Sequence, residues 1–376
     1  MNKEIPEVLK DAIFTDDKSM VEVEYTLSGY GGAKTWISVE RALLGEAHGR
    51  WKIVRRLQRY DNKMMTAEIP PDSLTRGNLF SNGTYETKGV KKKKVAWVQD
   101  LVIRGGAEIS NELVIRTGIE CGFNIKRVFQ TVSCSIIEDL LGQCDLIVLN
   151  NIWAFSDEQM RVIKMFIQKK PYVKYEHDHR ELGRLEFSKG LFSNSKLNVF
   201  LSPAHLNNYQ EKLGIDGICL PLAIDVDLFK PVQGVERKSN TALICNVRHL
   251  RTWLNLQKYV DEHPEILFTV MLNGETKVVG DNVTTRPMIP YEEMPKLYSG
   301  FEYLVHIMDG WGAGERVFFE GMLCGCNVIS NKRVGHTSWN EQESMGWVVD
   351  FKDVNGLREW LKKAPYQFWK AIDQRI

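Results

Sequence analysis

No segment of this 376-residue chain approaches the roughly 20 consecutive apolar residues that a membrane-spanning helix requires. The first residues, MNKEIPEVLKD, lack the apolar centre of a secretion signal. The formal net charge is only +1, so no global field demands a nucleic acid or a membrane as partner. Seven cysteines occur without C-x-x-C spacing, and we expect reduced, mostly buried thiols in a cytoplasmic protein.

Two cofactor signatures are also missing. Gly105-Gly106 is not the G-x-G-x-x-G fingerprint of a dinucleotide-binding turn, which disfavours a dehydrogenase. His177 and His179, flanked by acids, suggest a zinc clamp, but no third ligand cluster has suitable spacing. We therefore expect neither a resident metal nor an organic cofactor.

Short apolar strands alternate with helices from Val95 onwards, which predicts parallel sheets covered by helices. The polar, glycine-containing segment from Pro231 to Asn240 reads as a linker between two such units. We therefore predict an α/β protein with two Rossmann-like, doubly wound domains. The expected divisions are an N-terminal extension with β-strands at 1–89, a first domain at 90–232, a second at 233–355 and an amphipathic helix at 356–376.

The run GWGAGERVFFEGMLCGCNVISN, from Gly310 to Asn331, is the most informative part of the chain. Gly310, Gly312 and Gly314 form a loop before a short apolar helix, where free backbone N–H groups and the helix dipole favour an anion. Glu320 lies inside that helix, and a carboxylate among apolar residues is costly unless it is paired or hydrogen-bonded. A diphosphate at the helix start with a ribose on the carboxylate, as in a nucleotide-sugar, satisfies both conditions.

Five landmarks in one order resemble the GT-B glycosyltransferases, and specifically the large retaining family 4. They are Gly105-Gly106-Ala107-Glu108, Lys174-Tyr175-Glu176-His177-Asp178, the segment from Leu220 to Pro231, Asn246-Val247-Arg248 and Glu320-Gly321-Met322-Leu323-Cys324-Gly325-Cys326. The resemblance implies a GT-B fold whose last helix crosses back onto the first domain. It also implies retaining transfer of a sugar from a nucleotide-sugar to an acceptor hydroxyl.

The resemblance assigns roles to individual residues. His177 would be the active-site histidine, and Asp178 beside it could serve as a base toward the acceptor. Gly105 and Gly106 would let the backbone approach the donor, and Arg248 would grip its diphosphate without a metal ion. The other expected donor-binding residues are Arg251, Gly314, Glu315, Arg316, Val317 and Glu320, the last of them on the ribose. Glu315 is alternatively a cap that acts through the helix dipole.

The chain departs from the family pattern at two points. The family has two glutamates separated by seven residues, and counting back from Glu320 reaches Gly312 instead. With a three-residue insertion, Asp309 takes the place of the first acid and would accept a sugar hydroxyl. The lysine that usually follows the phosphate-binding arginine is missing, and Arg251 is the nearest cation. The identity of the donor sugar is therefore left open.

A basic stretch near the N-terminus suggests a particular acceptor. Arg50, Arg55, Arg56 and Arg59 lie in a segment with interleaved aromatic residues, a composition that can hold a phosphate backbone. The acceptor would then be a hydroxymethylated base in DNA, flipped out of the duplex. The alternative is a solvated basic face, with a glycan, a lipid headgroup or a protein hydroxyl as the acceptor.

The sequence thus predicts a retaining, metal-independent hexosyltransferase, with UDP favoured over GDP or ADP as the nucleotide of the donor. Two rival hypotheses belong to other classes. One is a GT-B-like binding module that has lost turnover, and the other is a nucleotide-sugar epimerase on the same fold.

Overall fold

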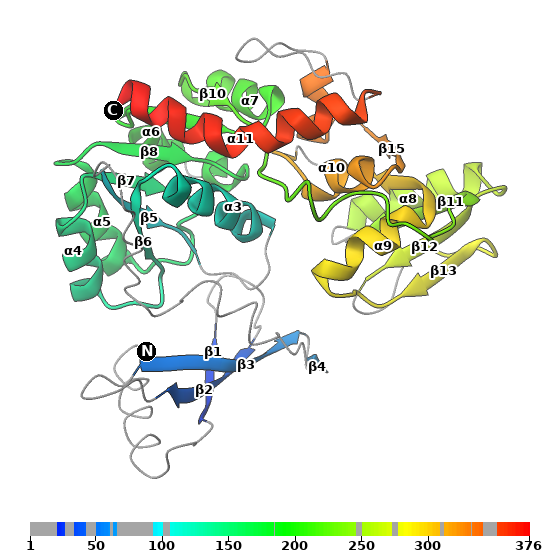
Figure 1. Cartoon of the computed structure of the whole chain (residues 1–376), viewed down its shortest axis with the longest axis horizontal. Coiled ribbons are helices and arrows are strands. Elements are labelled where there is room, and N and C mark those ends of the chain that lie inside the picture. Colours follow the sequence, from blue (N-terminus) through cyan, green and yellow to red (C-terminus); the bar gives the residue numbers. More distant parts are fainter. Residues whose placement is uncertain are drawn as a thin grey trace.

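The computed structural model describes residues 21–26, 34–42, 50–60, 63–65, 93–100, 106–183, 185–245, 250–272, 277–308, 312–331, 333–340 and 352–376. Its strands form three sheets, two of them parallel and covered by helices (Figure 1). We call the six-stranded sheet with its helices the first lobe and the five-stranded sheet with its helices the second lobe. The predicted α/β class with two doubly wound units is confirmed.

The remaining sheet is antiparallel and consists of β1 (Val21–Thr26), β2 (Lys34–Ala42), β3 (Arg50–Tyr60) and β4 (Lys63–Met65) in that order. It lies within the predicted N-terminal extension. The segment from Trp51 to Tyr60, which fits a strand or a helix by sequence, belongs to strand β3.

The first lobe has the strand order β10-β9-β8-β7-β5-β6, and all its pairs are parallel. Its strands are β5 (Lys94–Val98), β6 (Asn124–Val128), β7 (Leu146–Leu149), β8 (Tyr172–Tyr175), β9 (Leu197–Phe200) and β10 (Ile218–Cys219). Its helices are α3 (Gly106–Glu120), α4 (Cys134–Gly142), α5 (Asp157–Ile167), η1 (Arg180–Gly183), α6 (Leu185–Ser193) and α7 (Pro203–Leu213). The order reverses between β5 and β7, which is the topological switch point where ligands bind in such sheets.

The second lobe has the order β13-β12-β11-β14-β15, again with parallel pairs throughout. Its strands are β11 (Lys238–Cys245), β12 (Leu267–Met271), β13 (Val283–Arg286), β14 (Phe301–His306) and β15 (Asn327–Ser330). Its helices are α8 (Leu250–Glu262), η2 (Tyr291–Glu293), α9 (Met294–Ser299), α10 (Arg316–Leu323) and η3 (Gly335–Asn340). Its switch point lies between β11 and β14.

Helix boundaries follow local sequence signals. Ser156 caps α5 through a reciprocal capping box with Gln159. Ser202 caps α7, Pro203 occupies its first turn, and Gly214 ends it in the left-handed conformation that favours glycine. These signals fix where the loops that carry polar residues begin and end.

Strand β5 shows how the first lobe is packed. Val95 and Trp97 face a core shared with α3, whereas Ala96 and Val98 face a second core shared with α4 and α5. Because both faces of the sheet are covered, the strands read as continuous apolar runs rather than as alternating ones. Lys174 in β8 and Asn198 in β9 are buried polar exceptions in this sheet.

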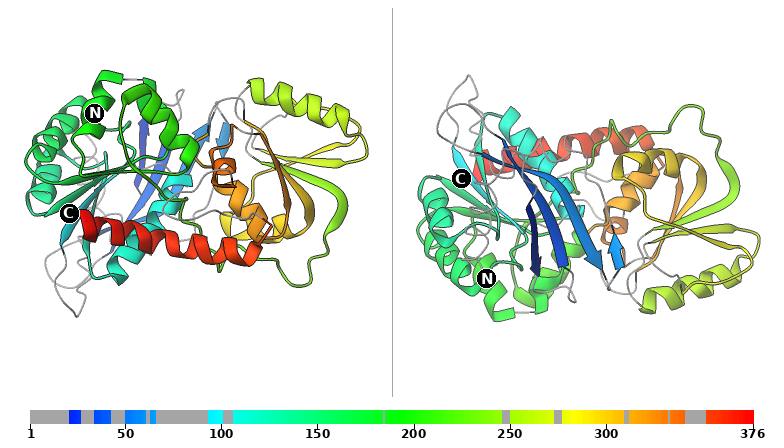
Figure 2. Two further views of the ribbon diagram at one scale, coloured as in Figure 1. Left: turned by 90° about the horizontal axis from the view of Figure 1, so that it is seen from above. Right: turned by 90° about the horizontal axis from the view of Figure 1, so that it is seen from below.

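The last helix, α11 (Val354–Arg375), belongs to the cores of both lobes (Figure 2). Leu357 and Trp360 pack into the second lobe, and Phe368 and Trp369 into the first. The Trp369 indole donates a hydrogen bond to the carbonyl of Val114 in α3 at 2.6 Å. The helix thus ties the two lobes together along one side.

The fold corrects one sequence prediction, the end of the linker, and confirms another, the state of the cysteines. The predicted linker ends too late, because the exposed residues Lys238 to Asn240 already belong to β11, whose register with β14 is irregular between Lys238 and Ala242. All seven cysteines are free thiols and most are buried, as expected. Within the described residues, no helix combines the length and the apolar character needed to cross a bilayer.

We predict that Gly118→Ala destabilises the protein, because a Cβ there would overlap the Trp369 ring and the Ile125 side chain. Overpacking of this kind costs roughly 1–3 kcal/mol. The matched control is Gly190→Ala in α6, where no atom lies within 4 Å of the added Cβ. That change should stabilise by about 0.5–1 kcal/mol through helix propensity. Urea unfolding of both variants checks the prediction, and two shifts of the same sign would contradict it.

Candidate functional site

Asp100 follows strand β5 at the switch point of the first lobe and is buried. Its two carboxylate oxygens accept hydrogen bonds from the backbone N–H groups of Trp153 and Ala154, at 2.9 and 3.0 Å. Burial raises the pKa of this carboxyl to about 6, although both hydrogen bonds favour the charged form. Asp100 therefore holds the loop after β7 against the end of β5.

A chain of buried amides orients helix α3. Asn150 donates to Asn111 at 3.0 Å, Asn111 donates to Gln99 at 2.9 Å, and the Trp97 indole donates to the same Gln99 oxygen at 2.7 Å. Buried polar groups that satisfy one another specify a single geometry. The first turn of α3 is thereby fixed beside the ends of β5 and β7.

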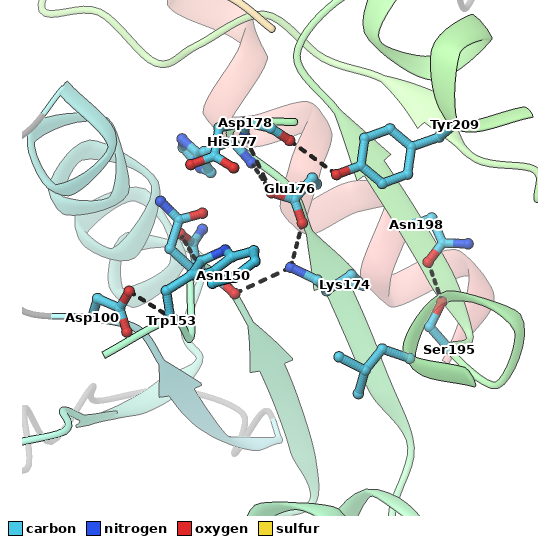
Figure 3. Close-up of polar contacts among 12 residues, drawn as sticks. Asp100, Asn150, Trp153, Lys174, Glu176, His177, Asp178, Ser195, Asn198 and Tyr209 are labelled. Atoms are coloured by element: carbon cyan, nitrogen blue, oxygen red, sulfur yellow. Dashed lines mark hydrogen bonds and ion pairs between the residues drawn. The ribbon is translucent and has the colours of Figure 1, made fainter. Parts of the chain in front are cut away.

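Strand β8 ends in a buried ion pair (Figure 3). The Lys174 ammonium lies 2.6 Å from the Glu176 carboxylate and donates to the carbonyl of Asn150 at 3.2 Å. The other Glu176 oxygen accepts from the backbone N–H groups of His177 and Asp178, both at 3.1 Å. Because a buried charge requires such partners, the pair dictates the turn that presents His177.

His177 is 8% exposed, and its ring packs on Tyr175 with ring centroids 4.3 Å apart. Neither ring nitrogen has a hydrogen-bond partner in the described part of the chain. Burial, followed by the charges of Lys174 and Arg316, lowers its pKa to about 3. The imidazole is therefore neutral near pH 7 and can donate one hydrogen bond and accept another.

The neighbouring residues of the same turn face the second lobe and helix α7. The carbonyl of Asp178 accepts from the Tyr209 hydroxyl at 3.0 Å and lies 3.1 Å from His205 Nε2. The His179 ring lies 4.6 Å from that of His205. Burial lowers the His179 pKa to about 4, against an opposing effect of the Gly312 backbone.

Glu108 lies half-buried on the first turn of α3. Burial raises its pKa to about 7, and the charges of Asp100 and Asp178 raise it as well, against a local backbone hydrogen bond. Three carboxyl groups thus interact electrostatically at this edge of the first lobe. Ionisable groups with such shifts are typical of functional sites.

The loop before α10 docks on the first lobe. The Ser202 hydroxyl donates to the carbonyl of Ala313 at 2.7 Å, and the Trp339 indole donates to the carbonyl of Leu201 at 3.1 Å. Gly314 lies against His336, and a Cβ at this glycine would come within 2.5 Å of that ring. The glycine loop therefore lies between the lobes, as its proposed contact with a donor requires.

Glu315 does not cap helix α10 in the way that the sequence suggested. It occupies the N-cap position of α10, but its side chain makes no capping hydrogen bond. Burial raises its pKa to about 8, so the carboxyl is largely protonated at neutral pH. A charge-based interaction with the helix dipole is therefore wrong for this residue. Val317, also expected at the donor, packs its side chain against the core of the second lobe.

Arg316 and Glu320 form the central contact of the site. Arg316 Nε lies 2.9 Å from Glu320 Oε1, and both side chains are buried. Tyr291 donates to the same carboxylate oxygen at 3.0 Å, and Tyr298 donates to the other at 3.4 Å. The expectation that a carboxylate here must be paired is confirmed, and its partner is an arginine of its own helix.

The Arg316 guanidinium reaches the first lobe as well. It donates to the Ser110 hydroxyl of α3 at 2.6 Å and to the carbonyl of Ala223 at 2.8 Å. A Cβ at Gly106, the first residue of α3, would lie 3.2 Å from Arg316 Cδ. The structure thus brings Gly106, Arg316 and Glu320 together at the boundary between the lobes, and the Arg316 charge acts on the pKa of His177.

Some predicted residues are not placed. Gly105, Arg248 and Asp309 lie outside the described residues, as does the side chain of Arg251, which belongs to α8. Arg248 lies three residues after the end of β11, and Asp309 lies three residues after the end of β14. Both strands flank the switch point of the second lobe. The expected roles of these residues stay predictions.

Several residues of the site were missed by the sequence analysis. Asp100 could have been found, because it follows a strand as His177 does. Lys174 lies in β8 and Glu176 directly follows that strand, and a spacing of two in extended chain places both on one face. Ser110 and Tyr291 gave no comparable signal, because they reach Arg316 from distant parts of the chain. The described residues contain no group of three or more His, Cys, Asp or Glu side chains placed to hold a metal ion.

No protein-family model and no curated protein sequence matches this chain. Solved structures do share its fold. The Anabaena protein HepE, solved with UDP and glucose, is 15% identical over 73% of this chain and 92% of its own, with a TM-score of 0.51. A glycosyltransferase from Rickettsia africae is 10% identical over 73% and 88%, with a TM-score of 0.53.

An alpha-glucosyltransferase solved with UDP is similar over 75% of this chain and 99% of its own, at 12% identity and a TM-score of 0.50. At these identities the likeness establishes the fold. This chain has the two-lobed fold of the GT-B glycosyltransferases.

Glu108 gives a prediction about pH. Its ordinary pKa of 4.5 rises to about 7 on folding, so folded protein holds this proton more tightly than unfolded protein. The resulting stabilisation is complete below the ordinary pKa and is lost as pH rises through the raised value. Glu108→Gln should therefore gain roughly 1–3 kcal/mol over the wild type between about pH 5 and about pH 8.

The measurement is urea unfolding at several pH values. Glu112→Gln serves as the control, because Glu112 lies on the same helix in a partly exposed ion pair with Arg127 at 2.6 Å. That variant should change stability by less than about 1 kcal/mol. An equal pH trend in both variants would rule out a special role for the Glu108 carboxyl.

Proposed function

We propose that this protein is a glycosyltransferase that moves a sugar from a nucleotide-sugar to an acceptor hydroxyl. The observation that carries the proposal is the contact of Gly106 with the Arg316–Glu320 pair between two doubly wound lobes, with His177 near enough for the Arg316 charge to lower its pKa. Each group belongs to an element that ends or begins at the binding edge of its sheet. The groups offer what a nucleotide-sugar needs: donors for phosphate, a carboxylate for ribose and a neutral imidazole for the sugar.

UDP is the proposed nucleotide. The structures of HepE and the alpha-glucosyltransferase, which share this fold, were solved with UDP. The diphosphate would lie at the start of α10, whose free backbone N–H groups and dipole favour an anion. Arg248 and Arg251 would add positive charge as the leaving phosphate gains negative charge. Because these cations neutralise the diphosphate, we propose that transfer needs no metal.

His177 would contact the donor sugar. A buried imidazole that has no partner among the described residues can still form two hydrogen bonds, and sugar hydroxyls can make both. Its low pKa keeps it uncharged, so it would not repel the positive charge that develops on the sugar ring. Retention of the anomeric configuration is the expectation that the family 4 resemblance supplies. Asp178 as a base and Asp309 as a hydroxyl acceptor complete the proposed catalytic set.

An uncharged polyol is the acceptor that we favour over DNA. Asp100, Glu108 and Asp178 interact at one edge of the first lobe, where carboxyl groups can bond hydroxyls in either protonation state and would repel a phosphate backbone when ionised. The DNA alternative rests on the basic residues Arg50, Arg55, Arg56 and Arg59, whose side chains lie outside the described part of the structure.

The decisive experiment is a panel of nucleotide-sugars, screened first by thermal shift and then by product analysis with and without acceptors. We expect UDP-sugars to raise the melting temperature. UDP release should depend on a glycan acceptor and persist in EDTA. Conversion of the donor without an acceptor would select the epimerase, and binding without turnover would select the non-catalytic module. Transfer to hydroxymethylated DNA alone would select the DNA-modifying alternative.

The ribose contact is tested with a nucleotide that lacks the ribose hydroxyls. Wild-type protein should bind UDP about tenfold more tightly than 2′,3′-dideoxy-UDP, because a hydrogen bond to a charged group is lost. Glu320→Gln should weaken UDP binding by a similar factor and bind the two nucleotides almost equally. Calorimetric titration measures both affinities.

The control is Tyr298→Phe, which removes a hydroxyl donor to Glu320 but keeps the charge of the carboxylate. This variant should still distinguish the two nucleotides. If Glu320→Gln weakened both nucleotides to the same extent, Glu320 would serve only as the counter-ion of Arg316.

A further inference from the structure

Arg316 makes contacts in four separate segments of the chain. Its nitrogens donate to Glu320 in its own helix, to Ser110 in α3, to the carbonyl of Ala223 and to the hydroxyl of Tyr291. The side chain is 7% exposed. A planar guanidinium with its nitrogens bonded in different directions has little freedom to move unless its partners move with it.

Two of these partners belong to the first lobe. Ser110 is fully buried in α3, and Ala223 belongs to the apolar core that α3 covers. Arg316 itself begins α10 of the second lobe. A single side chain therefore connects the helix that carries the proposed ribose carboxylate to the helix that carries Gly106 and Glu108.

The electrostatics of this arrangement depend on Glu320. The amino end of α3 carries partial positive charge, and Gly106 there lies against the Arg316 side chain. A guanidinium beside a positive helix end is unfavourable unless a negative charge compensates it. Glu320 supplies that charge, so any change in the partners of Glu320 alters the interaction between Arg316 and α3.

We propose that Arg316 is a positioning residue that couples nucleotide binding at Glu320 to the placement of α3. When ribose hydroxyls bind the Glu320 carboxylate, Arg316 and the ribose share its oxygens. The altered position of Arg316 then acts through its hydrogen bond with Ser110 on the first turn of α3. Donor binding in the second lobe thus sets the position of the first-lobe groups that meet the sugar and the acceptor. This inference rests on the proposed function.

The test removes the interlobe hydrogen bond and leaves the ion pair intact. In Ser110→Ala, Arg316 keeps Glu320, Tyr291 and Ala223, so the affinity for UDP should stay within about twofold of wild type. The kcat should fall about tenfold, the usual effect of losing a hydrogen bond to a charged group, while the KM for the donor is unchanged. The kcat is therefore expressed per UDP-binding site counted by titration, because unfolded molecules would lower the apparent kcat without changing the KM.

A second readout does not require turnover. Hydrogen exchange of residues 106–112 should slow about tenfold or more when UDP binds the wild type, and this response should be lost in Ser110→Ala. The matched control is Ser299→Ala in α9, which removes a buried hydroxyl that accepts from the N–H of Val232 at 2.9 Å. It should keep both the exchange response and the kcat.

The outcomes distinguish a failure of the proposed coupling from a failure of the proposed function. Wild-type protein that binds UDP without any response in α3, or Ser110→Ala with wild-type response and kcat, would overturn the coupling and leave the proposed function standing. Equal losses in Ser110→Ala and Ser299→Ala would also overturn it. Wild-type protein that binds no nucleotide would refute the proposed function, and the coupling with it.

Discussion

The buried Arg316–Glu320 pair is the contact on which the geometry of the site depends. Removing two charges from water is costly, and the cost is recovered only when each remaining donor and acceptor also finds a partner. Here the partners are Ser110, Tyr291 and the carbonyl of Ala223. Because they come from both lobes, satisfying one arginine also fixes where α3 lies relative to α10. The arrangement of the lobes is thus partly an electrostatic requirement.

A second buried ion pair, at the end of β8 in the first lobe, fixes local geometry in the same way. Lys174 and Glu176 compensate each other, and the second Glu176 oxygen accepts the hydrogen bonds that form the turn of His177. The positive charge of Lys174 also helps to keep His177 neutral. Burial raises the pKa of Glu108 and that of Glu315. Buried ionisable groups with such shifted pKa values destabilise the folded protein near neutral pH. Their position between two lobes therefore indicates a binding site rather than a structural core.

The sequence predicted the elements best where short apolar runs have polar ends. The sequence predicts strands at Tyr172–Tyr175 and Asn327–Ser330, and β8 and β15 have these bounds, because the boundaries coincide with changes in polarity. It predicts a further strand at Val199–Ser202, two residues later than β9, because Asn198 interrupts the apolar run of that strand. That side chain is satisfied internally by the carbonyls of Phe192 and Asp216, an arrangement that only the tertiary structure reveals.

The site was predicted in part for the same reason. Position relative to a strand end or helix start is a local property, which is why His177, Gly106 and Glu320 could be selected from the sequence. The partner of Glu320 was harder to identify. Arg316 lies one helical turn away, a spacing visible in the sequence, but an arginine beside a glycine loop suggests a phosphate ligand equally well. Its contact with Ser110 joins residues far apart in the chain and has no local signature.

Low identity to structures of the same fold follows from these constraints. Parallel sheets covered on both faces require apolar side chains of suitable volume, and many sequences meet that requirement. Identities of 10% to 15% are therefore compatible with one fold. Chemistry is restricted to a few strand ends and helix starts, where a substitution changes charge or hydrogen bonding directly. Differences in substrate between proteins of this fold should accordingly arise at positions such as Asp309, Glu315 and Arg316, where this chain departs from simple apolar or glycine-rich sequence.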